Sequence, residues 1–564
     1  MMRNYIFIFL ILVCLIGFPG FAQGFAKEFG QNTRESPLDG HIVFAPLASR
    51  TTYMIDEESQ VLQTWDSNYL PGLSVYWNPD NSIYRTMLIP GGGDIGGQGG
   101  GIQKIASDGT ILWEYTYTSS TYWAHHDFVP LSNGNVLMLA RETKTFQEAT
   151  EEGRNPDVIQ LIQGDPQTDF IIEVQPTGPT TGDIVWEWHA WDHLIQDFDS
   201  SKNNFGVVRD HPELIDINYH NEVSADWLHT NSLDYNEQLD QILISVRTFN
   251  EIWVIDHSTT TEQASGHTGG LSGKGGDLLY RWGNPEAYDR GSSSDRELFW
   301  QHDAVWVPDT YPGEGNILIF NNGVGRGYSS VDEITPPIDS QGAYTLTQEG
   351  YGPFSLTWSY VAQPPEDFYA LHLSGQCRLQ NGNTLILQGE RGHFFIVDTN
   401  QEILWSYDYP SAPLLGQIFK PYYVPNTTPM GPIIQTVGSL QWSDVKPGGT
   451  VHGSFIIRNI GFGRMNWSID TSLVTWGNWT IAPSSGFCYH NDSILITVDV
   501  VVPEEENSDF EGYLKVQNLN NPMDFELVPV ILTTELSLAQ YNQKQSIVVQ
   551  MIEMHKNSYR PVIM

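Results

Sequence analysis

The sequence predicts an all-β protein: a six-bladed β-propeller followed by a small immunoglobulin-like β-sandwich. The first observation behind this fold class is a set of six short apolar runs that each end in tryptophan. The second is a set of short apolar runs that follow an Asn-Gly or Gly-Asn turn. The third is a change to longer alternating strands after residue 433. Units that recur at irregular spacing are typical of a repeat array with insertions. The six tryptophans are Trp65, Trp113, Trp186, Trp282, Trp358 and Trp405.

Each repeat reads as four short strands, in the order histidine strand, Asn-Gly strand, Ile-Asp strand and tryptophan strand. An Asn-Gly turn before an apolar run, as at 133–139 and 381–387, is typical of a hairpin that leads into a strand. The Ile-Asp type is seen at 252–256 and 394–398. Four antiparallel strands repeated around an axis form propeller blades, so six tryptophan strands predict six blades. The alternative is a pair of β-sandwiches in which the repeats are coincidental.

The two ends of this array predict how the ring closes. Residues 41–65 supply only three strands and lack the innermost one. We expect residues 416–420, after the last tryptophan strand, to provide the missing strand, because pairing the two ends removes exposed sheet edges. The propeller would then occupy residues 40–425.

A proline-rich stretch at 410–432 is typical of a linker. Residues 433–534 contain the alternating strands of the predicted sandwich domain. The last segment, 535–564, gives no structural prediction and is treated as a tail.

The N-terminus has the features of a secretory signal peptide at residues 1–22. Arg3 precedes an apolar run at 5–18, and Ala22 marks the expected cleavage point. The apolar run is short for a bilayer span, so a transmembrane anchor is the less favoured interpretation. We expect export to the periplasm or the extracellular space, and no integral membrane segment after cleavage.

Composition excludes some classes of partner. The chain has 67 acidic and 27 basic residues and a formal net charge of −40, which would repel nucleic acid and anionic membranes. Of the three cysteines, Cys14 would leave with the signal peptide. Cys377 and Cys488 fall in different predicted domains, so no disulfide framework is expected.

The candidate site lies where the innermost strands begin, at one mouth of the central channel. His126, His229 and His302 occupy such positions. Neighbouring strand residues face opposite ways, so only one of His125 and His126 can face the channel, and the match between His126-Asp127 and His302-Asp303 favours His126. Each histidine alone would more often be structural. Three histidines and an arginine together would form an anion site in an acidic protein. The further candidates are Arg247, Asn231 and Ser374.

These residues resemble the bacterial and archaeal aryl-sulfate sulfotransferases. The similar segments are 124–127 with 132–135, 226–232 with Arg247, 301–303 and 378–384, and together they cover roughly residues 40–425. The resemblance implies a six-bladed propeller that moves a sulfuryl group from a phenyl sulfate ester to a phenol without a nucleotide cofactor. It also implies a transiently sulfurylated histidine.

By order along the chain, the resemblance assigns that role to His302, with His126, His229, Asn231 and Arg247 as its companions. His125 and Ser374 are added as candidate substrate-binding residues. The paired histidines and the C-terminal sandwich domain are departures from the family pattern.

The chemistry suits these residue types. Transfer of a group with negatively charged oxygens depends on positioning and electrostatics, so Arg247 and Asn231 are expected to hold the oxygens. A neutral His302 would be the nucleophile, with Asp303 or a backbone carbonyl fixing its tautomer. His126 or His229 would exchange the proton with the phenols.

Three other functions remain open from the sequence. A propeller that only binds carbohydrate or protein at the channel mouth is the first alternative. A quinone-cofactor dehydrogenase would need an acidic calcium cluster at the mouth, and a zinc hydrolase would be expected to carry a His-Glu-x-x-His motif, which the sequence lacks. We therefore expect no metal and no cofactor in the reaction, and only an aryl sulfate donor and a phenol acceptor as ligands.

Overall fold

The computed structural model describes residues 36–535 apart from short gaps, together with residues 546 and 550. The predicted signal peptide at 1–22 lies outside the described residues, as does nearly all of the predicted tail at 535–564. The gaps are 79, 91–96, 98, 163, 220–223, 340–341, 411–415, 427–432, 460–464, 489–492 and 522–523.

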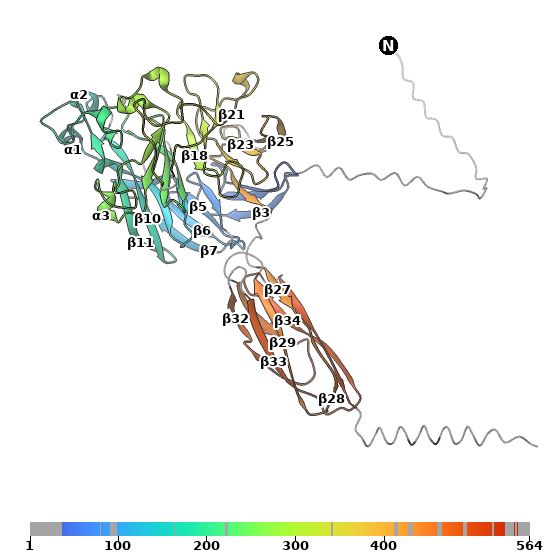
Figure 1. Ribbon diagram of the computed structural model, residues 1–564. Coiled ribbons are helices and arrows are strands. Elements are labelled where there is room, and N and C mark those ends of the chain that lie inside the picture. The colour runs from blue at the N-terminus through green and yellow to red at the C-terminus, as the bar shows by residue number, and fades with distance from the viewer. Residues whose placement is uncertain are drawn as a thin grey trace, which may run out of the picture. The chain divides into compact units, whose positions relative to one another are not determined.

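Between residues 40 and 425 the described chain forms six four-stranded antiparallel sheets in succession (Figure 1). The first sheet has the order β26-β1-β2-β3, with β1 (Gly40–Phe44), β2 (Thr51–Ile55), β3 (Val61–Asp66) and β26 (Tyr422–Pro425). The second contains β4 (Val75–Trp77), β5 (Ile83–Leu88), β6 (Gly100–Ile105) and β7 (Ile111–Thr116). The third contains β8 (Tyr122–Pro130), β9 (Val136–Thr143), β10 (Gln167–Gly178) and β11 (Thr181–His189).

The remaining three sheets follow the same plan of consecutive strands. The fourth contains β14 (Thr230–Asn236), β15 (Gln241–Val246), β16 (Glu251–Asp256) and β17 (Tyr280–Trp282). The fifth contains β18 (His302–Trp306), β19 (Ile317–Asn321), β20 (Ser330–Ile334) and β21 (Trp358–Tyr360). The sixth contains β22 (Gly375–Arg378), β23 (Thr384–Gln388), β24 (His393–Val397) and β25 (Ile403–Asp408).

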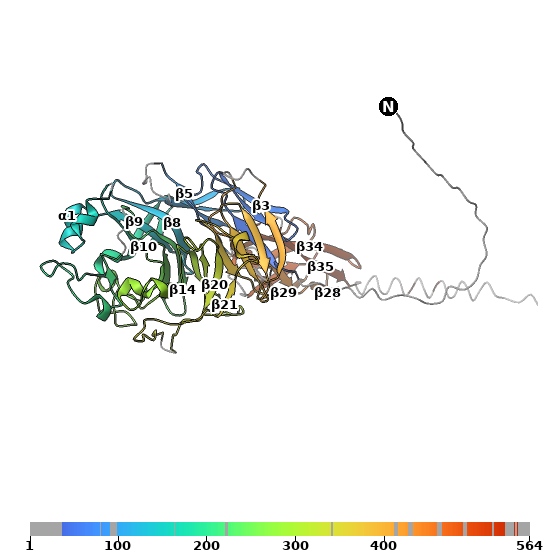
Figure 2. The same ribbon diagram turned by 90° about the horizontal axis from the view of Figure 1, so that it is seen from above.

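The strands within each sheet are ordered from an inner to an outer edge. Each of the six tryptophans lies on the strand at one edge: β3, β7, β11, β17, β21 or β25. The strands at the other edge contact one another, since β8 contacts β14, β14 contacts β18, β18 contacts β22 and β26 contacts β4. Figure 2 shows β5, β8, β14 and β20 following one another through this body. The predicted all-β class is confirmed, and so is the order of the four strand types.

The strand that completes the first sheet is β26 rather than the predicted residues 416–420. β26 pairs with β1 in antiparallel register, with Ile42 opposite Tyr423. Residues 416–420 make only an isolated bridge between Ile418 and Pro46. The prediction was therefore early by a few residues. The apolar character of 416–420 reflects burial in the interior, where Phe419 is 0% exposed, and not pairing in the sheet.

The connections between strands carry the little helix that the described chain has. Long insertions between the strands lie within residues 144–230 and 257–280. The helices are α1 (Phe146–Glu151), α2 (Pro156–Ile159) and α3 (Thr261–Ala264), with short 3-10 turns η1 (Ala190–Asp192), η2 (Val208–Asp210), η3 (Pro285–Tyr288), η4 (Ser293–Asp295) and η5 (Pro365–Asp367). The short parallel strands β12 (Leu194–Ile195) and β13 (Ile215–Asp216) also lie in these connections.

Among the described residues, no helix has the length and apolar character needed to cross a membrane.

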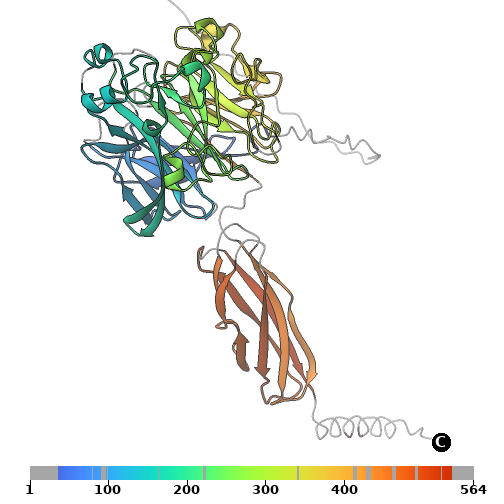
Figure 3. The same cartoon turned by 60° about the vertical axis from the view of Figure 1, so that its left-hand side comes forward.

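Residues 434–534 form two packed sheets (Figure 3). A shared core of buried side chains that includes Phe455, Trp467 and Leu514 lies between the sheets. One sheet has the order β27-β29-β33-β31, with β27 (Ile434–Val437), β29 (Thr450–Asn459), β31 (Asn478–Ala482) and β33 (Ser493–Val501). The other has the order β28-β35-β34-β30-β32, with β28 (Leu440–Val445), β30 (Met465–Asp470), β32 (Ser485–Cys488), β34 (Asp509–Asn518) and β35 (Phe525–Thr534). Parts of the predicted linker at 410–432 lie outside the described residues.

Candidate active site

Three histidines from three successive sheets meet around Phe419. The rings of His126 and His229 lie 4.9 Å apart, and Phe419 lies 6.1 Å from the His126 ring and 6.4 Å from the His302 ring. His126 is within β8, His229 directly precedes β14, and His302 begins β18. The convergence predicted from the spacing of these residues is therefore present in the structure.

The backbone is irregular at each of these three positions. The pairing of β8, β14 and β18 with its neighbour shifts register beside the histidine. The φ angle is +47° at His126, +48° at His229 and +49° at Asp303, values that are uncommon for residues other than glycine. A bulge re-aims the side chains around it, which is how these strands direct imidazoles to one place.

A hydrogen bond fixes the tautomer of His302. Its Nδ1 lies 2.8 Å from Asn322 Oδ1. Asn322 Nδ2 donates to the carbonyl oxygens of Ala370 and Leu373, at 3.0 and 3.1 Å, so the amide oxygen must face the imidazole. The proton of a neutral His302 is therefore on Nδ1. Its Nε2 carries the free lone pair, as a nucleophile requires.

Neither Asp303 nor a backbone carbonyl fixes this tautomer, so that expectation was wrong. Asp303 Oδ2 accepts a hydrogen bond from the backbone N–H of Gln376 at 3.0 Å. Asp127 acts in the same way, because its Oδ2 accepts from Leu233 N at 3.0 Å. Neighbouring strand residues point to opposite sides, so each aspartate faces away from its histidine. The two aspartates each join their own strand to the edge strand of the following sheet, from β8 to β14 and from β18 to β22.

Burial keeps two of the imidazoles neutral. Burial lowers the pKa of His302 well below its usual value, and the charge of Arg247 lowers that pKa further. Burial also lowers the pKa of His126, with smaller contributions from His229 and His125. Both imidazoles are therefore neutral at neutral pH, with one ring nitrogen free to act as a nucleophile or a base.

A buried charged network lies behind His126 and His229. Arg141 is 0% exposed, and its guanidinium lies 3.2 Å from Asp169 and 3.0 Å from Asp226. Asp226 is hydrogen bonded to His229 Nδ1, and Asp169 lies 3.3 Å from His125 Nε2. Burial raises the pKa of Asp226, but Arg141 and His229 outweigh burial and bring it below its usual value. The network holds ionised carboxylates, of which Asp226 orients His229 and Asp169 faces His125.

The structure distinguishes His125 from His126. His126 lies beside His229, whereas His125 faces Asp169 in the buried network. Nδ1 of His125 is 2.7 Å from Nδ1 of His126, so one nitrogen donates to the other. A proton on His125 Nε2, which faces the carboxylate, makes its Nδ1 the acceptor. His126 then carries its proton on Nδ1 and presents an unprotonated Nε2.

Arg247 and Asn231 line the same region. The Arg247 guanidinium lies 3.7 Å above the ring of Trp300, a cation–π contact that holds the charged plane in place. Asn231 Nδ2 donates to the carbonyl of Gln301 at 2.8 Å. Asn231 is fully buried, and its Oδ1 has no hydrogen-bond partner among the described residues. Asn231 thus presents an acceptor to the interior.

Ser374 has a different environment from the one expected. Its hydroxyl accepts a hydrogen bond from the backbone N–H of Gly389 at 2.9 Å. The residue is fully buried, with a φ of +81°. These contacts stabilise the turn before β22, and Ser374 has no described contact with the three histidines.

A glycine-rich loop approaches His126. A Cβ atom placed on Gly97 would lie 1.8 Å from His126 Cε1, and the φ of Gly97 is +85°. Glycine is therefore required for this close approach. Parts of this loop, at 91–96 and 98, lie outside the described residues.

Asn322 and Arg141 were not predicted from the sequence, although the repeat contains a pattern that indicates both. Arg141, Arg247 and Asn322 each lie six residues after a polar residue at, or directly before, the start of the second strand of their sheet: Asn135, Gln241 and Asn316. The same position in three sheets therefore supplies a side chain to the site or to its supporting network. Asp226 and Asp169 had weaker signals, since only Asp226 is close to a site histidine in sequence.

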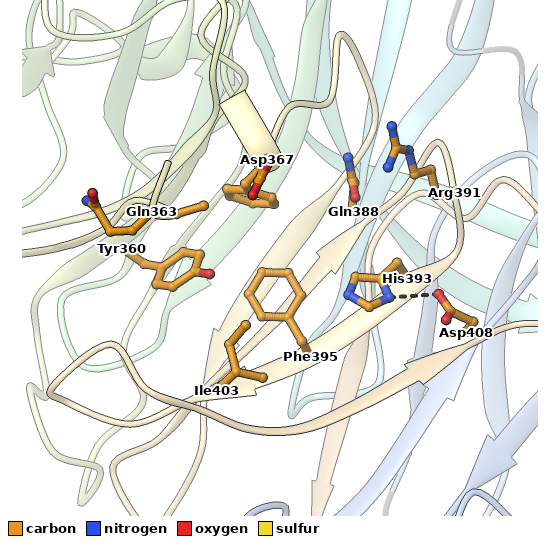
Figure 4. A pocket seen from close by; sticks show the side chains of 11 residues that line it. Tyr360, Gln363, Asp367, Gln388, Arg391, His393, Phe395, Ile403 and Asp408 are labelled. Carbon is orange, nitrogen blue, oxygen red and sulfur yellow. Dashed lines mark hydrogen bonds and ion pairs between the residues drawn. The ribbon is translucent and has the colours of Figure 1, made fainter. Parts of the chain in front are cut away.

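A separate pocket lies among residues 360–408, and the three histidines do not line it (Figure 4). Its volume is about 350 Å³, and its walls include Tyr360, Arg391 and Phe395. His393 Nδ1 lies 2.7 Å from Asp408 Oδ1 at its edge. None of the predicted site residues lines this pocket.

Comparison with known proteins identifies the family. The family model described as "Arylsulfotransferase (ASST)" matches residues 74–409, which is more than half of the chain. The chain belongs to the arylsulfotransferase family, and membership supports aryl sulfotransferase activity in general. No curated protein matches the chain.

Solved structures with some similarity share little sequence with this chain. A protein of unknown function from Bacteroides caccae has 10% identity and a TM-score of 0.38, over 68% of this chain and 99% of that one. A streptogramin B lyase has 9% identity and a TM-score of 0.34, over 67% and 82%. A PapD-like domain of human CEP192 has 12% identity and a TM-score of 0.15, over 18% and 83%. Similarities at this level define no activity.

Proposed function

We propose that this protein transfers a sulfuryl group from a phenolic sulfate ester to a phenol through a covalent intermediate on His302, without a nucleotide donor. The observation that carries the proposal is the orientation of His302, which Asn322 fixes with a free Nε2. Family membership supports the reaction class, and the site residues supply its steps.

In the first half-reaction, His302 Nε2 attacks the sulfur atom of the donor. The N–S bond forms, the bond between sulfur and the aryl oxygen breaks, and a phenolate leaves. The low pKa of His302 keeps its lone pair available at neutral pH. Arg247, held over Trp300, stabilises the negative sulfuryl oxygens.

Proton transfer uses the two other histidines. His229, hydrogen bonded to Asp226 through Nδ1, is placed to give a proton to the leaving phenolate. In the second half-reaction, an unprotonated His126 or His229 accepts the proton of the phenol acceptor, whose oxygen attacks sulfur and releases His302. Asn231 offers an acceptor oxygen, so it suits the hydroxyl of a phenol better than a sulfuryl oxygen.

The test is intact-protein mass after brief exposure to an aryl sulfate. The wild-type protein should gain one sulfuryl group and release one equivalent of phenol in a burst, with ping-pong kinetics overall. His302→Ala should show neither the burst nor the adduct, whereas His126→Ala and His229→Ala should form the adduct more slowly. An adduct that persists in His302→Ala would assign the nucleophile elsewhere. Binding of the ester with no phenol release by the wild type would favour a non-catalytic binding protein.

We also propose that residues 40–425 form the catalytic domain and residues 433–534 a separate immunoglobulin-like domain. The supporting observation is that each region has buried core clusters of its own. Export through a signal peptide at 1–22 is part of the same proposal and rests on the sequence.

A further inference from the structure

A second group of polar side chains lies in the insertions of the third and fourth sheets. His193 follows η1, while His267 and Asp277 lie in the loop between α3 and β17. His193 Nδ1 is 2.9 Å from Asp277 Oδ1, and His267 Nδ1 is 2.7 Å from the same oxygen. Each of the three residues offers one potential ligand atom, and these atoms all lie within 4.8 Å of one another. None of these residues takes part in the proposed sulfuryl transfer.

The contacts of His193 leave its Nδ1 without a proton when the ring is neutral. His193 Nε2 lies 2.8 Å from the carbonyl oxygen of Ala264, which can only accept, so Nε2 carries the proton. A neutral His193 therefore turns its Nδ1 lone pair toward a carboxylate oxygen that also has lone pairs. A positive charge between these atoms removes the conflict.

The surroundings of His193 match those of a metal ligand. Histidines that bind metals commonly donate their other ring N–H to a carbonyl or carboxylate, as His193 does to Ala264. The ring is 0% exposed and stacks on Trp188 with an interplanar angle of 6°. Trp188 Nε1 in turn donates to the carbonyl of Gly276, which adjoins Asp277. The ring is thus fixed in orientation before any ion binds.

The loop that carries the other two ligands approaches Ala264 and His193 closely. A Cβ on Gly276 would lie 2.0 Å from the Ala264 carbonyl oxygen and 2.6 Å from His193 Nε2, so only glycine fits there. The loop is also held across its width, because Gly276 N donates to Gly266 O at 2.9 Å. The His267 side chain is 60% exposed, yet its Nδ1 is directed at Asp277. An ion at this site would therefore be accessible to solvent on the side of His267.

We propose that His193 Nδ1, His267 Nδ1 and an Asp277 carboxylate oxygen bind one zinc ion that pins this loop to the preceding insertion. Two imidazole nitrogens and one carboxylate suit zinc better than calcium or magnesium, which prefer oxygen ligands. Tetrahedral ligands around zinc lie about 3.3 Å apart, given metal–ligand distances of about 2.0–2.1 Å. The present contacts of 2.7 and 2.9 Å need to open by a few tenths of an ångström. Water would complete the coordination on the exposed side.

The ion has a structural role in this proposal and lies outside the reaction. It joins His193, which precedes β12, to the loop that precedes β17. The three catalytic histidines are different residues, in the strands β8 and β18 and just before β14. Chelation should therefore lower thermal stability and leave the turnover of an aryl sulfate intact at temperatures where the protein remains folded.

The test is zinc titration of the full-length mature protein after dialysis against a chelator. Zinc content after gel filtration should reach one equivalent, and the Tm should rise with zinc but not with calcium or magnesium. His267→Ala and Asp277→Asn should lose both effects. Because the His267 side chain is 60% exposed, His267→Ala should still fold. His211→Ala is the matched control, since His211 is an exposed histidine paired with one carboxylate, Glu213. It should retain one equivalent.

Two results would overturn the proposal. One is a wild-type protein that retains no stoichiometric zinc and shows no zinc-dependent Tm. The other is equal zinc binding by His267→Ala, Asp277→Asn and the wild type, which would place the ion elsewhere. Loss of turnover in step with loss of zinc, in protein that is still folded, would contradict the structural role.

Discussion

The bond between His302 Nδ1 and Asn322 Oδ1 decides which nitrogen of His302 can attack sulfur. In Asn322→Leu the imidazole loses this partner and can adopt either tautomer or rotate. A nucleophile displaced by about 1 Å can lose roughly 10²-fold in rate, and we expect a loss of that size in kcat. Stopped-flow measurement of the phenol burst separates this slower sulfurylation from loss of substrate binding. An unchanged burst rate would contradict the role of Asn322.

Asn322→Asp gives a sharper test, through pH. A carboxylate beside His302 favours the imidazolium and raises the pKa of His302, which burial holds below its usual value in the wild type. The nucleophile is then protonated, and inactive, up to a higher pH. The acidic limb of the kcat/KM profile should move to higher pH. Asn133→Asp, an exposed turn residue whose Oδ1 accepts from Asn135 N, adds the same charge and should leave the profile unmoved.

Residue types and spacing predicted the positions of His126, His229 and His302, but not their partners. Asp303 follows His302 directly, so adjacency suggested a pair, yet strand alternation directs it to Gln376 on the next sheet. Asn322 lies twenty residues away and comes close only because β18 and β19 pair. Hydrogen bonds across a hairpin depend on register, and the bulge at His302 shifts that register.

Closure of the first sheet depends on the buried ion pairs of Lys420, which lies just before β26. Lys420 Nζ lies 2.7 Å from Asp127 Oδ2 and 3.5 Å from Asp303 Oδ1, and its side chain is 5% exposed. Burial lowers the pKa of Lys420, but the two aspartates and Tyr76 outweigh burial and hold it well above its usual value. One cation therefore joins the closing segment to the third and fifth sheets. The prediction placed a strand at 416–420 because this segment contains apolar residues. An apolar pattern gives no indication that Lys420 is a buried charge.

Lys420→Met should destabilise the protein by about 3–5 kcal/mol, because it leaves buried carboxylates without their cation. Burial raises the pKa of Asp303 to about 6 even with Lys420 present, and Lys420 opposes that rise. Protonation of Asp303 thus favours the folded state at low pH, and this contribution is lost as the pH rises through about 6. The deficit of Lys420→Met relative to the wild type should therefore be largest above pH ~6 and smaller below it.

Denaturant unfolding at several pH values measures this deficit. Lys104→Met is the matched control, because Lys104 pairs with Asp80 at 2.9 Å on the surface, where the side chains are 19% and 38% exposed. An exposed pair of this kind contributes about 0–1 kcal/mol. Equal losses in the two variants would show that the buried cluster does not hold the closing segment.

The family match and the folded unit end at different residues. The match stops at residue 409, before β26 at Tyr422–Pro425. β26 supplies Val424, which is 1% exposed, to the core of the first sheet. The all-β class and the succession of sheets followed from repeats that the sequence shows. The closing strand was harder to predict, because it belongs to no complete repeat and its partner lies almost four hundred residues away.

A chain that ends at Asn426 should fold and turn over an aryl sulfate as the full-length protein does, because it keeps β26, Phe419 and Lys420. A chain that ends at Tyr409 leaves β1 as an unpaired edge and leaves Asp127 and Asp303 without Lys420. We expect it to aggregate and to show no cooperative thermal transition. Calorimetry and turnover of the two truncated chains measure the difference. A folded, active chain ending at Tyr409 would show that closure by β26 is dispensable, while an inactive chain ending at Asn426 would give the C-terminal sandwich a part in the reaction.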